Sequence, residues 1–313
     1  MSRQMLVPLR LLALSTDPVF GQVGEIYINT VTKNLRVQLS PGFGSYMIAN
    51  YASENKNLRW IYEGYMGIKT SKKGTDWIDI GVFSSPYTYE FAKSWEQVLF
   101  TRSLAPEYVP YYLLGLRYKR KINTNLSLTT FLLNGWQHLE IQRKIPSLGT
   151  QLEYTKKKNY INWTSYQGNE KNVAQPNFGY RFFTEMSWIY TTNKFKLFAC
   201  GYTGMQLISG QAKFWGQVHF AGEFQLIKKL LVNARIEQFC DPNNIQIRQG
   251  SNHGFNCSGI SLGLHTKVTD FLFLFEINCA SCNASLSSAR GRYERIAKYS
   301  PDILKNSVKF FTC

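Results

Sequence analysis

Histidine and serine are the residues through which this chain could do covalent chemistry, and their spacing argues against it. The four histidines are His138, His219, His253 and His265. Hydrolases built into membrane barrels combine serine, histidine and asparagine on the outer wall, and no spacing here indicates such a set. His219 and His265 fall on the polar face of predicted strands, where hydrogen bonding is the expected role. We therefore expect no catalytic residue and no enzyme activity.

The six cysteines indicate neither a metal site nor a redox site. Cys279 and Cys282 form a CxxC motif, but no second CxxC completes a zinc site and no βαβ context favours redox chemistry. Cys240 and Cys257 flank a polar segment and could bridge it in an oxidising compartment. Unpaired structural thiols are the favoured interpretation. No metal and no cofactor are expected.

Charged and amide side chains gather on one face of the predicted strands. That face carries Glu63, Lys69, Asp79, Arg117, Gln151, Glu153, Gln217, His219, Glu223, Arg235, Glu237 and Glu276. Such groups can pair across strands and keep a lumen wetted, or they can form a charge ladder that selects solutes. We favour the first interpretation, because strand parity does not place a residue at a constriction. In both cases these residues are predicted to line a lumen.

The elements that carry these side chains have a period of two, which is typical of β-strands. In the run 214–226, Phe214 and Phe220 lie on one face and Gln217 and His219 on the other. The apolar faces carry bulky aromatic residues near their ends, as the girdles of a membrane barrel require. No run of about 18 apolar residues is present, so no transmembrane helix is expected.

These patterns predict an all-β protein, an antiparallel up-and-down transmembrane β-barrel. Counting the alternating runs gives about 14 strands, and the even-number rule allows roughly 12 to 16. A sheet that spans lipid must close, because an open edge leaves backbone groups unpaired. A barrel of this size has room for a water-filled lumen.

The positive charge lies mainly at the turns. The formal net charge is +16, and lysine and arginine cluster in short turns such as 119–121 and 156–158. Proteins that bind nucleic acid gather basic residues on one face or along a helix, so no nucleic-acid partner is expected. Short basic turns alternate with longer polar loops, which predicts periplasmic turns and external loops. A soluble all-β module that binds polyanions is kept as an alternative.

One connection, from Ser84 to Val109, is too long for an ordinary hairpin loop. Its aromatic residues argue against simple disorder. It is predicted either to fold into the lumen as a constriction or to cap the barrel outside. The residues to follow are Tyr87, Trp95, Arg102 and Glu107.

The chain divides into a barrel and two less regular ends. Residues 1–20 are interpreted as a poor leader or a truncated N-terminus, since the apolar run is short and interrupted by Pro8 and Arg10. Residues 21–283 form the predicted barrel domain. Residues 284–313 lack clean alternation, and the closing strand is expected there if that segment contains one.

Three segments carry a family resemblance. They read IYEGYMGIKTSKKGTDWIDIGVFSS, LFTRSLAPEYVPYYLLGLRY and LSLTTFLLNGWQ, and the Asn134-Gly135-Trp136 step is the most specific part. They resemble the OmpL-like outer-membrane β-barrel porins of Bacteroidota from about Leu35 to Asn278.

The resemblance implies a passive channel for small hydrophilic solutes in the bacterial outer membrane, with outer-membrane lipid as its surroundings and with homo-oligomers left open. The alternative within the same fold is a non-conducting barrel that serves as a structural or surface-binding protein.

Overall fold

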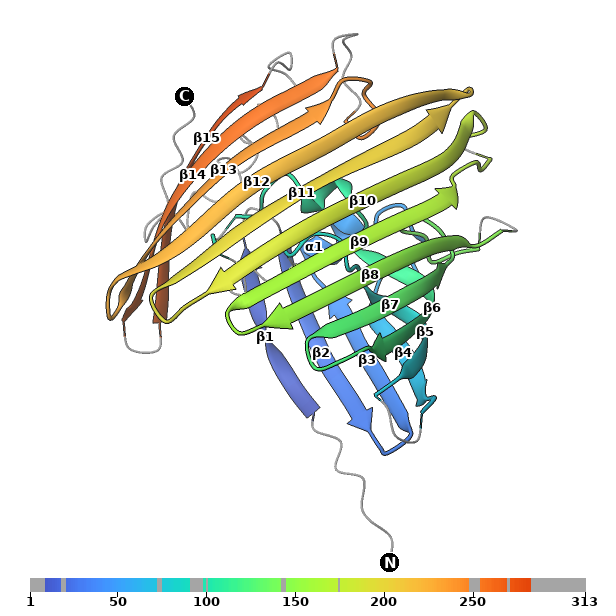
Figure 1. Ribbon diagram of the computed structural model, residues 1–313, viewed down its shortest axis with the longest axis horizontal. Helices are drawn as coiled ribbons and strands as arrows, with labels where there is room; N and C mark the ends of the chain where they lie inside the picture. The colour runs from blue at the N-terminus through green and yellow to red at the C-terminus, as the bar shows by residue number, and fades with distance from the viewer. Residues whose placement is uncertain are drawn as a thin grey trace, which may run out of the picture.

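The protein is built from one long antiparallel sheet. The computed structural model describes residues 9–17, 21–71, 75–90, 98–99, 101–141, 145–173, 175–247, 254–268 and 271–282. They form fifteen strands, each paired with the next along the chain, and the sheet curls so that its first strands lie behind the middle ones (Figure 1). The all-β, up-and-down architecture is confirmed, and the strand count lies within the predicted range. Within the described residues, no ladder joins β1 to β15.

Most strands reach or exceed the roughly 9–11 residues that a tilted strand needs to cross a bilayer. Their bounds are β1 (Leu9–Asp17), β2 (Gly21–Val31), β3 (Leu35–Phe43), β4 (Ile61–Lys69), β5 (Trp77–Ser84), β6 (Tyr112–Lys121), β7 (Leu126–Leu133), β8 (Ser147–Lys156), β9 (Asn159–Asn169), β10 (Phe178–Thr191), β11 (Phe195–Ile208), β12 (Gln211–Ile227), β13 (Leu230–Asp241), β14 (Phe255–Val268) and β15 (Phe271–Cys282). One short helix, α1 (Ser45–Asn50), and one 3-10 turn, η2 (Pro106–Tyr108), accompany them. Among the described residues, no helix is long and apolar enough to cross a membrane.

Burial alternates along the strands in the reverse of the order that is usual for a water-soluble sheet. On β12, Phe214 and Phe220 are about half exposed, whereas Gln217 and His219 are buried. A face of exposed aromatic and aliphatic side chains is stable against lipid tails and unfavourable against water. The alternation therefore directs the apolar face outward and the polar face into the curled sheet.

The two ends of the sheet differ in their connections, as predicted. Short turns lie along the lower edge of Figure 1, at 32–34, 122–125, 157–158, 192–194 and 228–229. Longer loops lie at the opposite end, at 44–60, 85–111, 134–146, 170–177 and 242–254. Basic residues mark several short turns, namely Lys33, Lys157, Lys158, Lys194, Lys228 and Lys229.

One connection at the loop end departs from this rule. β11 and β12 are joined by Ser209 and Gly210 alone, with φ angles of 49° and 81°. Two consecutive residues with positive φ are characteristic of the type I′ turn, whose twist matches that of the flanking strands. The two longest paired strands therefore form a tight hairpin.

Gly81 marks the point where β5 changes its packing. Its φ is +138°, and a Cβ atom there would lie 2.2 Å from the carbonyl oxygen of Gly64. Only glycine fits this close approach without moving β4. Beyond it, Val82 packs in a cluster with Met47 of α1, while Phe83 packs in the cluster around the β5–β6 loop. β5 therefore ends with both faces covered.

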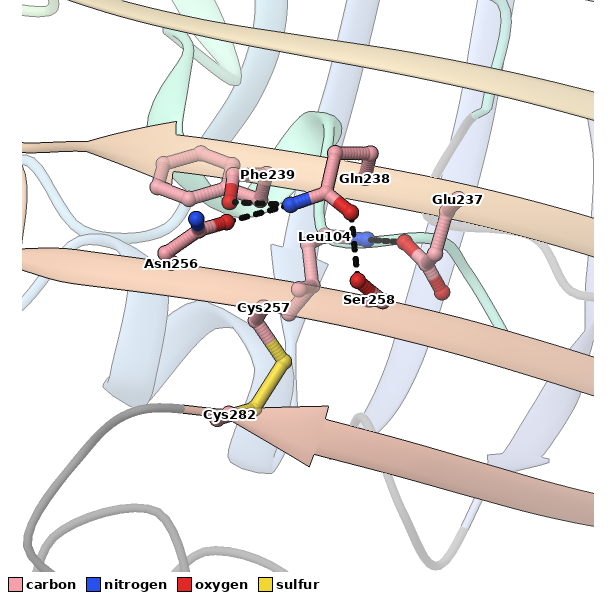
Figure 2. Close-up of a disulfide and its surroundings, with 8 residues drawn as sticks. All are labelled: Leu104, Glu237, Gln238, Phe239, Asn256, Cys257, Ser258 and Cys282. Atoms are coloured by element: carbon pink, nitrogen blue, oxygen red, sulfur yellow. Dashed lines mark hydrogen bonds between the residues drawn. A yellow bond between two sulfur atoms is a disulfide. The ribbon is translucent and has the colours of Figure 1, made fainter.

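Cys257 of β14 and Cys282 of β15 form a disulfide and are direct partners in the register (Figure 2). The favoured expectation of unpaired thiols is therefore wrong for Cys257 and Cys282. The alternative, a Cys240–Cys257 bridge, is not formed, and Cys240 is free. Cys240 is exposed and lies opposite Asn256, whereas Cys257 is buried. Neighbouring residues of a strand point to opposite faces, so the Cys240 and Cys257 side chains cannot meet across this ladder.

The structure describes part of the N-terminal segment 1–20 but none of the C-terminal segment 284–313. Leu9–Asp17, within the segment interpreted as a leader, forms β1 and pairs with β2, for instance Leu11 opposite Ile26. Residues 284–313, where a closing strand was expected, lie outside the described residues.

The outward face of β12 allows a test of lipid exposure. Phe220 lies near the middle of β12 and Leu226 near its end, both exposed on the same face. We expect Phe220→Arg to destabilise the folded barrel in bilayers by about 2–4 kcal/mol, because arginine is most unfavourable at the bilayer midplane. Leu226→Arg, the matched control, should lower stability by about 1 kcal/mol or less. Equal effects in refolding titrations would contradict the outward placement of this face.

The disulfide makes a second prediction. Peptide mapping without reduction should recover Cys257 linked to Cys282, and a Cys240–Cys257 link would contradict this register. Because the bridge closes a separation of 25 residues, Cys282→Ser should lower the free energy of unfolding by about 3 kcal/mol. Cys279→Ser on the same strand is the control, since Cys279 is free, and it should leave stability nearly unchanged.

Candidate functional site

The loop between β5 and β6 lies inside the curled sheet. Carboxylates on the far wall accept hydrogen bonds from its backbone N–H groups. Thr88 donates to Oε2 of Glu185 on β10 at 2.7 Å, and Thr101 donates to Oε2 of Glu276 on β15 at 2.9 Å. Charged acceptors make such bonds roughly twice as strong as neutral ones. The described part of the loop therefore crosses the interior, which is one of the two placements expected for it.

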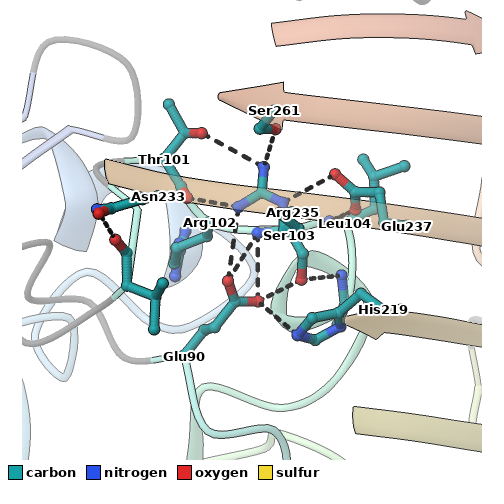
Figure 3. A network of polar contacts seen from close by, with 12 residues as sticks. Glu90, Thr101, Arg102, Ser103, Leu104, His219, Asn233, Arg235, Glu237 and Ser261 are labelled. Atoms are coloured by element: carbon teal, nitrogen blue, oxygen red, sulfur yellow. Dashed lines mark hydrogen bonds and ion pairs between the residues drawn. The ribbon is translucent and has the colours of Figure 1, made fainter. Parts of the chain in front are cut away.

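A third carboxylate fixes the middle of the loop. Oε2 of Glu237 on β13 accepts the Leu104 N–H at 2.7 Å (Figure 3). From the same strand, the Asn233 side chain donates to the Val98 carbonyl oxygen. Strands far from β5 in sequence thus hold the loop from the opposite side of the interior.

Arg235 is the cation at the centre of this contact (Figure 3). Its Nη1 donates to the Thr101 carbonyl oxygen at 2.7 Å, and its Nη2 donates to the Ser261 hydroxyl at 3.0 Å. It also lies 3.3 Å from Glu237 and 3.7 Å from Glu90 of the loop. A buried carboxylate is unfavourable without a cation or hydrogen-bond donors. Arg235 therefore allows acidic residues of the loop and of the wall to approach each other.

His219 and Gln217 extend the network along β12. His219 is fully buried, its Nδ1 lies 2.9 Å from the Gln217 amide nitrogen, and its Nε2 lies 3.9 Å from Glu90. Its ring packs against Phe198 at 4.9 Å. These neighbours indicate that His219 serves as a hydrogen-bonding group. We call the region where the loop meets β12, β13 and β15 the loop contact.

A mainly aromatic cluster of wall side chains packs with the loop. The loop contributes Tyr87, Ala105 and Val109. The wall contributes Phe83, Leu113, Phe131, Leu133, Tyr166, Phe183, Tyr202, Trp215, Phe239, Phe255 and Cys257. The inner face, predicted to carry charged and amide groups, also carries aromatic side chains where the wall meets the loop. The aromatic side chains face inward there because the loop supplies an apolar surface for them to pack against.

Tyr87 shows how this packing is achieved. Its ring stacks on Trp136 at 5.5 Å and meets Phe183 edge-on at 5.2 Å, and its hydroxyl donates to the Ser165 carbonyl oxygen at 3.4 Å. Burial raises the pKa of the Tyr87 phenol well above its usual value. Tyr87 therefore remains a neutral donor that anchors the start of the loop to β9.

A second charged cluster lies on β3, β5 and β6. Asp79 is fully buried, and its two oxygens accept bonds of 2.6 Å from Nε and Nη2 of Arg36. Nε of Arg117 also donates to Asp79 at 2.6 Å. The Arg36 guanidinium lies over the Trp77 ring at 4.6 Å, and that of Arg117 over Tyr65 at 4.5 Å. One carboxylate thus holds two guanidinium groups in fixed positions.

Both guanidinium groups line a cavity of about 470 Å³, which we call the side cavity. Its lining comprises Arg36, Ser84, Ser85, Pro86, Thr88, Tyr89, Arg117, Lys119, Thr129, Phe131, Gln151, Glu153, Tyr160 and Asn162. Lys119 Nζ lies 2.9 Å from Oε2 of Glu153, and Gln151 donates to the Asn162 side-chain oxygen at 2.9 Å. The cavity is bounded by the start of the loop on one side and by β5–β9 on the other.

The predicted lining residues thus separate into groups. Asp79, Arg117, Gln151 and Glu153 gather at the side cavity, and Gln217, His219, Arg235, Glu237 and Glu276 gather at the loop contact. Glu63 accepts bonds from the Ser84 N–H at 3.0 Å and from its hydroxyl. Lys69 lies at the end of β4 opposite Trp77, and Glu223 lies opposite Lys196 on β11. Within the described contacts, Lys69 and Glu223 join neither group.

The predicted loop residues also differ in their placement. Arg102 Nη2 lies 2.5 Å from Oε1 of Glu107, and its guanidinium lies 5.4 Å from the Tyr111 ring centre. Glu107 also accepts a bond from the Tyr111 hydroxyl at 2.9 Å. Arg102 and Glu107 thus pair within the loop. Trp95 lies outside the described residues.

Sequence reasoning missed several residues of these clusters. Glu185 and Arg36 alternate with apolar residues on β10 and β3, so strand parity could have identified both. Glu90 carried no signal, because a loop has no period. Asn162 was not singled out either, although its side chain donates to the Pro86 carbonyl oxygen at 3.3 Å.

The arrangement offers hydrogen bonding and charge. The described residues contain no group of three or more histidine, cysteine, aspartate or glutamate residues that could hold a metal ion. The polar groups of the loop contact bond mainly to one another, although His219 Nε2 and Asn233 Oδ1 are buried without a hydrogen-bond partner among the described residues. The polar groups of the side cavity border open space. What the site can do is bind or guide a polar solute.

Comparison with known proteins identifies the family. Residues 15–283 match the family model described as "Putative beta-barrel porin-2, OmpL-like". No curated protein matches the sequence.

Solved porins share the fold at low sequence identity. One porin structure superposes with a TM-score of 0.52 at 9% identity, covering 85% of this chain and 88% of that chain. An anion-selective porin from Comamonas acidovorans gives 0.53 at 7% identity over 79% and 74% of the two chains. OmpF of Salmonella typhi, in complex with daunomycin, gives 0.52 at 11% identity over 80% and 84%. Because the family model matches most of the sequence, the chain belongs to the OmpL-like β-barrel porins.

Proposed function

We propose that this outer-membrane porin lets small hydrophilic solutes diffuse passively through its interior. The observation that carries the proposal is the reversed burial of the strands, with charged and amide groups inside and exposed apolar groups outside. Membership of a porin family supports the same reading. Transport of this kind needs a wetted path and no bond making.

In this proposal the β5–β6 loop is the constriction. It borders both the side cavity and the aromatic cluster, and wall carboxylates hold it at Thr88, Thr101 and Leu104. A loop fixed in this way limits the size of solutes. The lining groups named above set the charge that a solute meets, whereas Arg102 and Glu107 form an ion pair with each other.

A second candidate is a non-conducting barrel with a structural or surface-binding role. The aromatic cluster favours it, because Phe83, Tyr166 and Phe183 of the wall pack directly with the loop and fill the interior at that level. The third candidate, a soluble module that binds polyanions, conflicts with the row of exposed apolar residues on β12. It predicts extraction without detergent, so membrane fractionation tests it.

Conductance separates the first two candidates. We expect the folded protein to give discrete channels in planar bilayers, and deletion of residues 87–107 to raise the single-channel conductance, because the deletion removes the obstruction from the interior. A folded barrel that never conducts, yet conducts after the deletion, would establish the plugged form and overturn the passive channel. Heat-modifiable migration on gels checks that both proteins are folded.

The wall carboxylates should hold the loop in place. We expect Glu185→Gln and Glu276→Gln each to weaken a charge-assisted bond by about 1–2 kcal/mol. Amide hydrogen exchange at Thr88 in the first variant, and at Thr101 in the second, should accelerate at least about fivefold, since 1.4 kcal/mol corresponds to roughly tenfold.

Glu223→Gln is the matched control, because Glu223 lies opposite Lys196 on β11 and no described contact joins it to the loop. Unchanged exchange at Thr88 and Thr101 in the first two variants would show that the loop is held by other contacts.

A further inference from the structure

We infer that the side cavity is a subsite for small anionic solutes, with the guanidinium groups of Arg36 and Arg117 as the binding groups. Its part in permeation rests on the proposed channel function, whereas the binding itself does not. The ligand chemistry is a carboxylate or phosphate group.

Asp79 uses only part of the donor capacity beside it. Its bonds occupy Nε and Nη2 of Arg36 and Nε of Arg117. A guanidinium carries five N–H donors in a planar fork. Among the described residues, neither Nη1 of Arg36 nor either terminal nitrogen of Arg117 has a further partner. Both arginine side chains are about one-fifth exposed and line the side cavity.

The two guanidinium groups are held rigidly, which favours binding. Arg117 lies between the rings of Tyr65 and Phe83, at 4.5 and 4.7 Å, and Arg36 lies over Trp77. The aromatic rings cover the faces of the guanidinium groups and leave their edges for hydrogen bonding. A planar fork that is already fixed loses little conformational entropy when it binds a carboxylate or phosphate in a bidentate manner.

The side cavity offers no free carboxylate to a cation. Among its described lining residues, Glu153 is the acidic one, and both of its oxygens are occupied, by Lys119 at 2.9 Å and by the Tyr160 hydroxyl at 3.1 Å. The cationic lining residues are Arg36, Arg117 and Lys119. Against them stand the carboxylates of Glu153 and of Asp79, so the net formal charge around the cavity is +1.

Two further carboxylates approach from behind the lining. Glu63 accepts bonds from Ser84, and Glu185 accepts the N–H of Thr88. Each is separated from the cavity by the residue that it binds. They lower the potential of the cavity over a distance, but a solute meets the guanidinium N–H groups directly.

The size of the cavity suits a small solute. A water molecule occupies about 30 Å³ in the liquid, and binding sites for small molecules commonly measure about 300–1,000 Å³. The side cavity, at about 470 Å³, falls in that range. Hydroxyls of Ser85 and Thr88 and amides of Gln151 and Asn162 complete a lining that can replace part of a hydration shell.

The test combines selectivity with binding. In a KCl gradient across a planar bilayer, we expect a reversal potential that shows preference for chloride over potassium. Arg117→Gln and Arg36→Gln should each reduce the chloride-to-potassium permeability ratio roughly two- to fivefold. Inorganic phosphate should reduce the chloride current of the unaltered protein and have less effect on either variant.

Arg120→Gln is the matched control. Arg120 lies on the same strand as Arg117, but its side chain is 61% exposed and it is not part of the side cavity. Arg120→Gln removes the same charge three residues further along β6, and it should leave the permeability ratio and the phosphate effect nearly unchanged. Arg117→Lys keeps the charge without the bidentate fork, so it should retain the selectivity and lose most of the phosphate effect.

Calorimetry of phosphate binding to the folded protein in detergent distinguishes a failure of the anion subsite from a failure of the channel function. Channels that prefer potassium, or an equal effect of Arg117→Gln and Arg120→Gln, would overturn the anion subsite and leave the channel function standing. Binding of phosphate that Arg117→Gln abolishes, in a protein that does not conduct, would support the subsite and overturn the channel. Absence of both binding and conductance would overturn both. Gel migration shows whether each variant has folded, and Arg36→Gln replaces Arg117→Gln if the latter does not fold.

Discussion

The continuous antiparallel ladder is the constraint on which the rest of this structure depends. Lipid offers no hydrogen-bond partner, so the backbone groups of each spanning strand must be paired with neighbouring strands. Among the described residues, β2 to β14 are each paired on both sides by sequential neighbours, and most connections are short turns at one end and longer loops at the other. Once the ladder is fixed, every side chain is assigned to lipid or to the interior by parity alone.

Parity has a consequence for the interior. With the apolar residues facing lipid, no ordinary hydrophobic core remains to fill the curled sheet. The β5–β6 loop supplies one locally, because its Tyr87 and Val109 pack against inward-facing Phe183 and Phe239 of the wall. Wall carboxylates then bind the loop backbone, so that a segment without regular structure satisfies its own N–H groups. The loop and the inward aromatic residues are therefore mutually dependent.

The charged side chains of the inward faces gather in two regions. Where the loop meets β13, Arg235 lies close to Glu90 and Glu237 and offsets part of their negative charge, and the polar groups there bond mainly to one another. Around Asp79 the ratio of carboxylates to cations is reversed, because one carboxylate binds two arginines and open space lies beside them. A closed polar network stabilises, whereas an open one with spare donors remains available to a solute. The two regions thus differ in the task that they suit, although both lie on inward faces.

The amino-acid sequence alone was sufficient to predict the sheet, because a period of two and the absence of long apolar runs leave few folds open. Strand parity also predicted that Asp79, Arg117, Glu153, Arg235 and Glu276 share the inward face, and in the structure Asp79, Arg235 and Glu276 are buried while Arg117 and Glu153 line the side cavity.

Which of these side chains come into contact depends on how the strands and the loop pack in three dimensions. Arg36 and Asp79 are 43 residues apart in sequence, and Thr101 and Glu276 are 175 apart. Strand parity determines which face of the sheet a side chain occupies, but not its position along the barrel axis or the residue that it contacts. The same limit explains the disulfide, since the register of β14 and β15 brings Cys257 to Cys282 while Cys240 points to the other face. The path of the loop was beyond sequence reasoning for a related reason, because a segment without a period carries no sign of the wall against which it will pack.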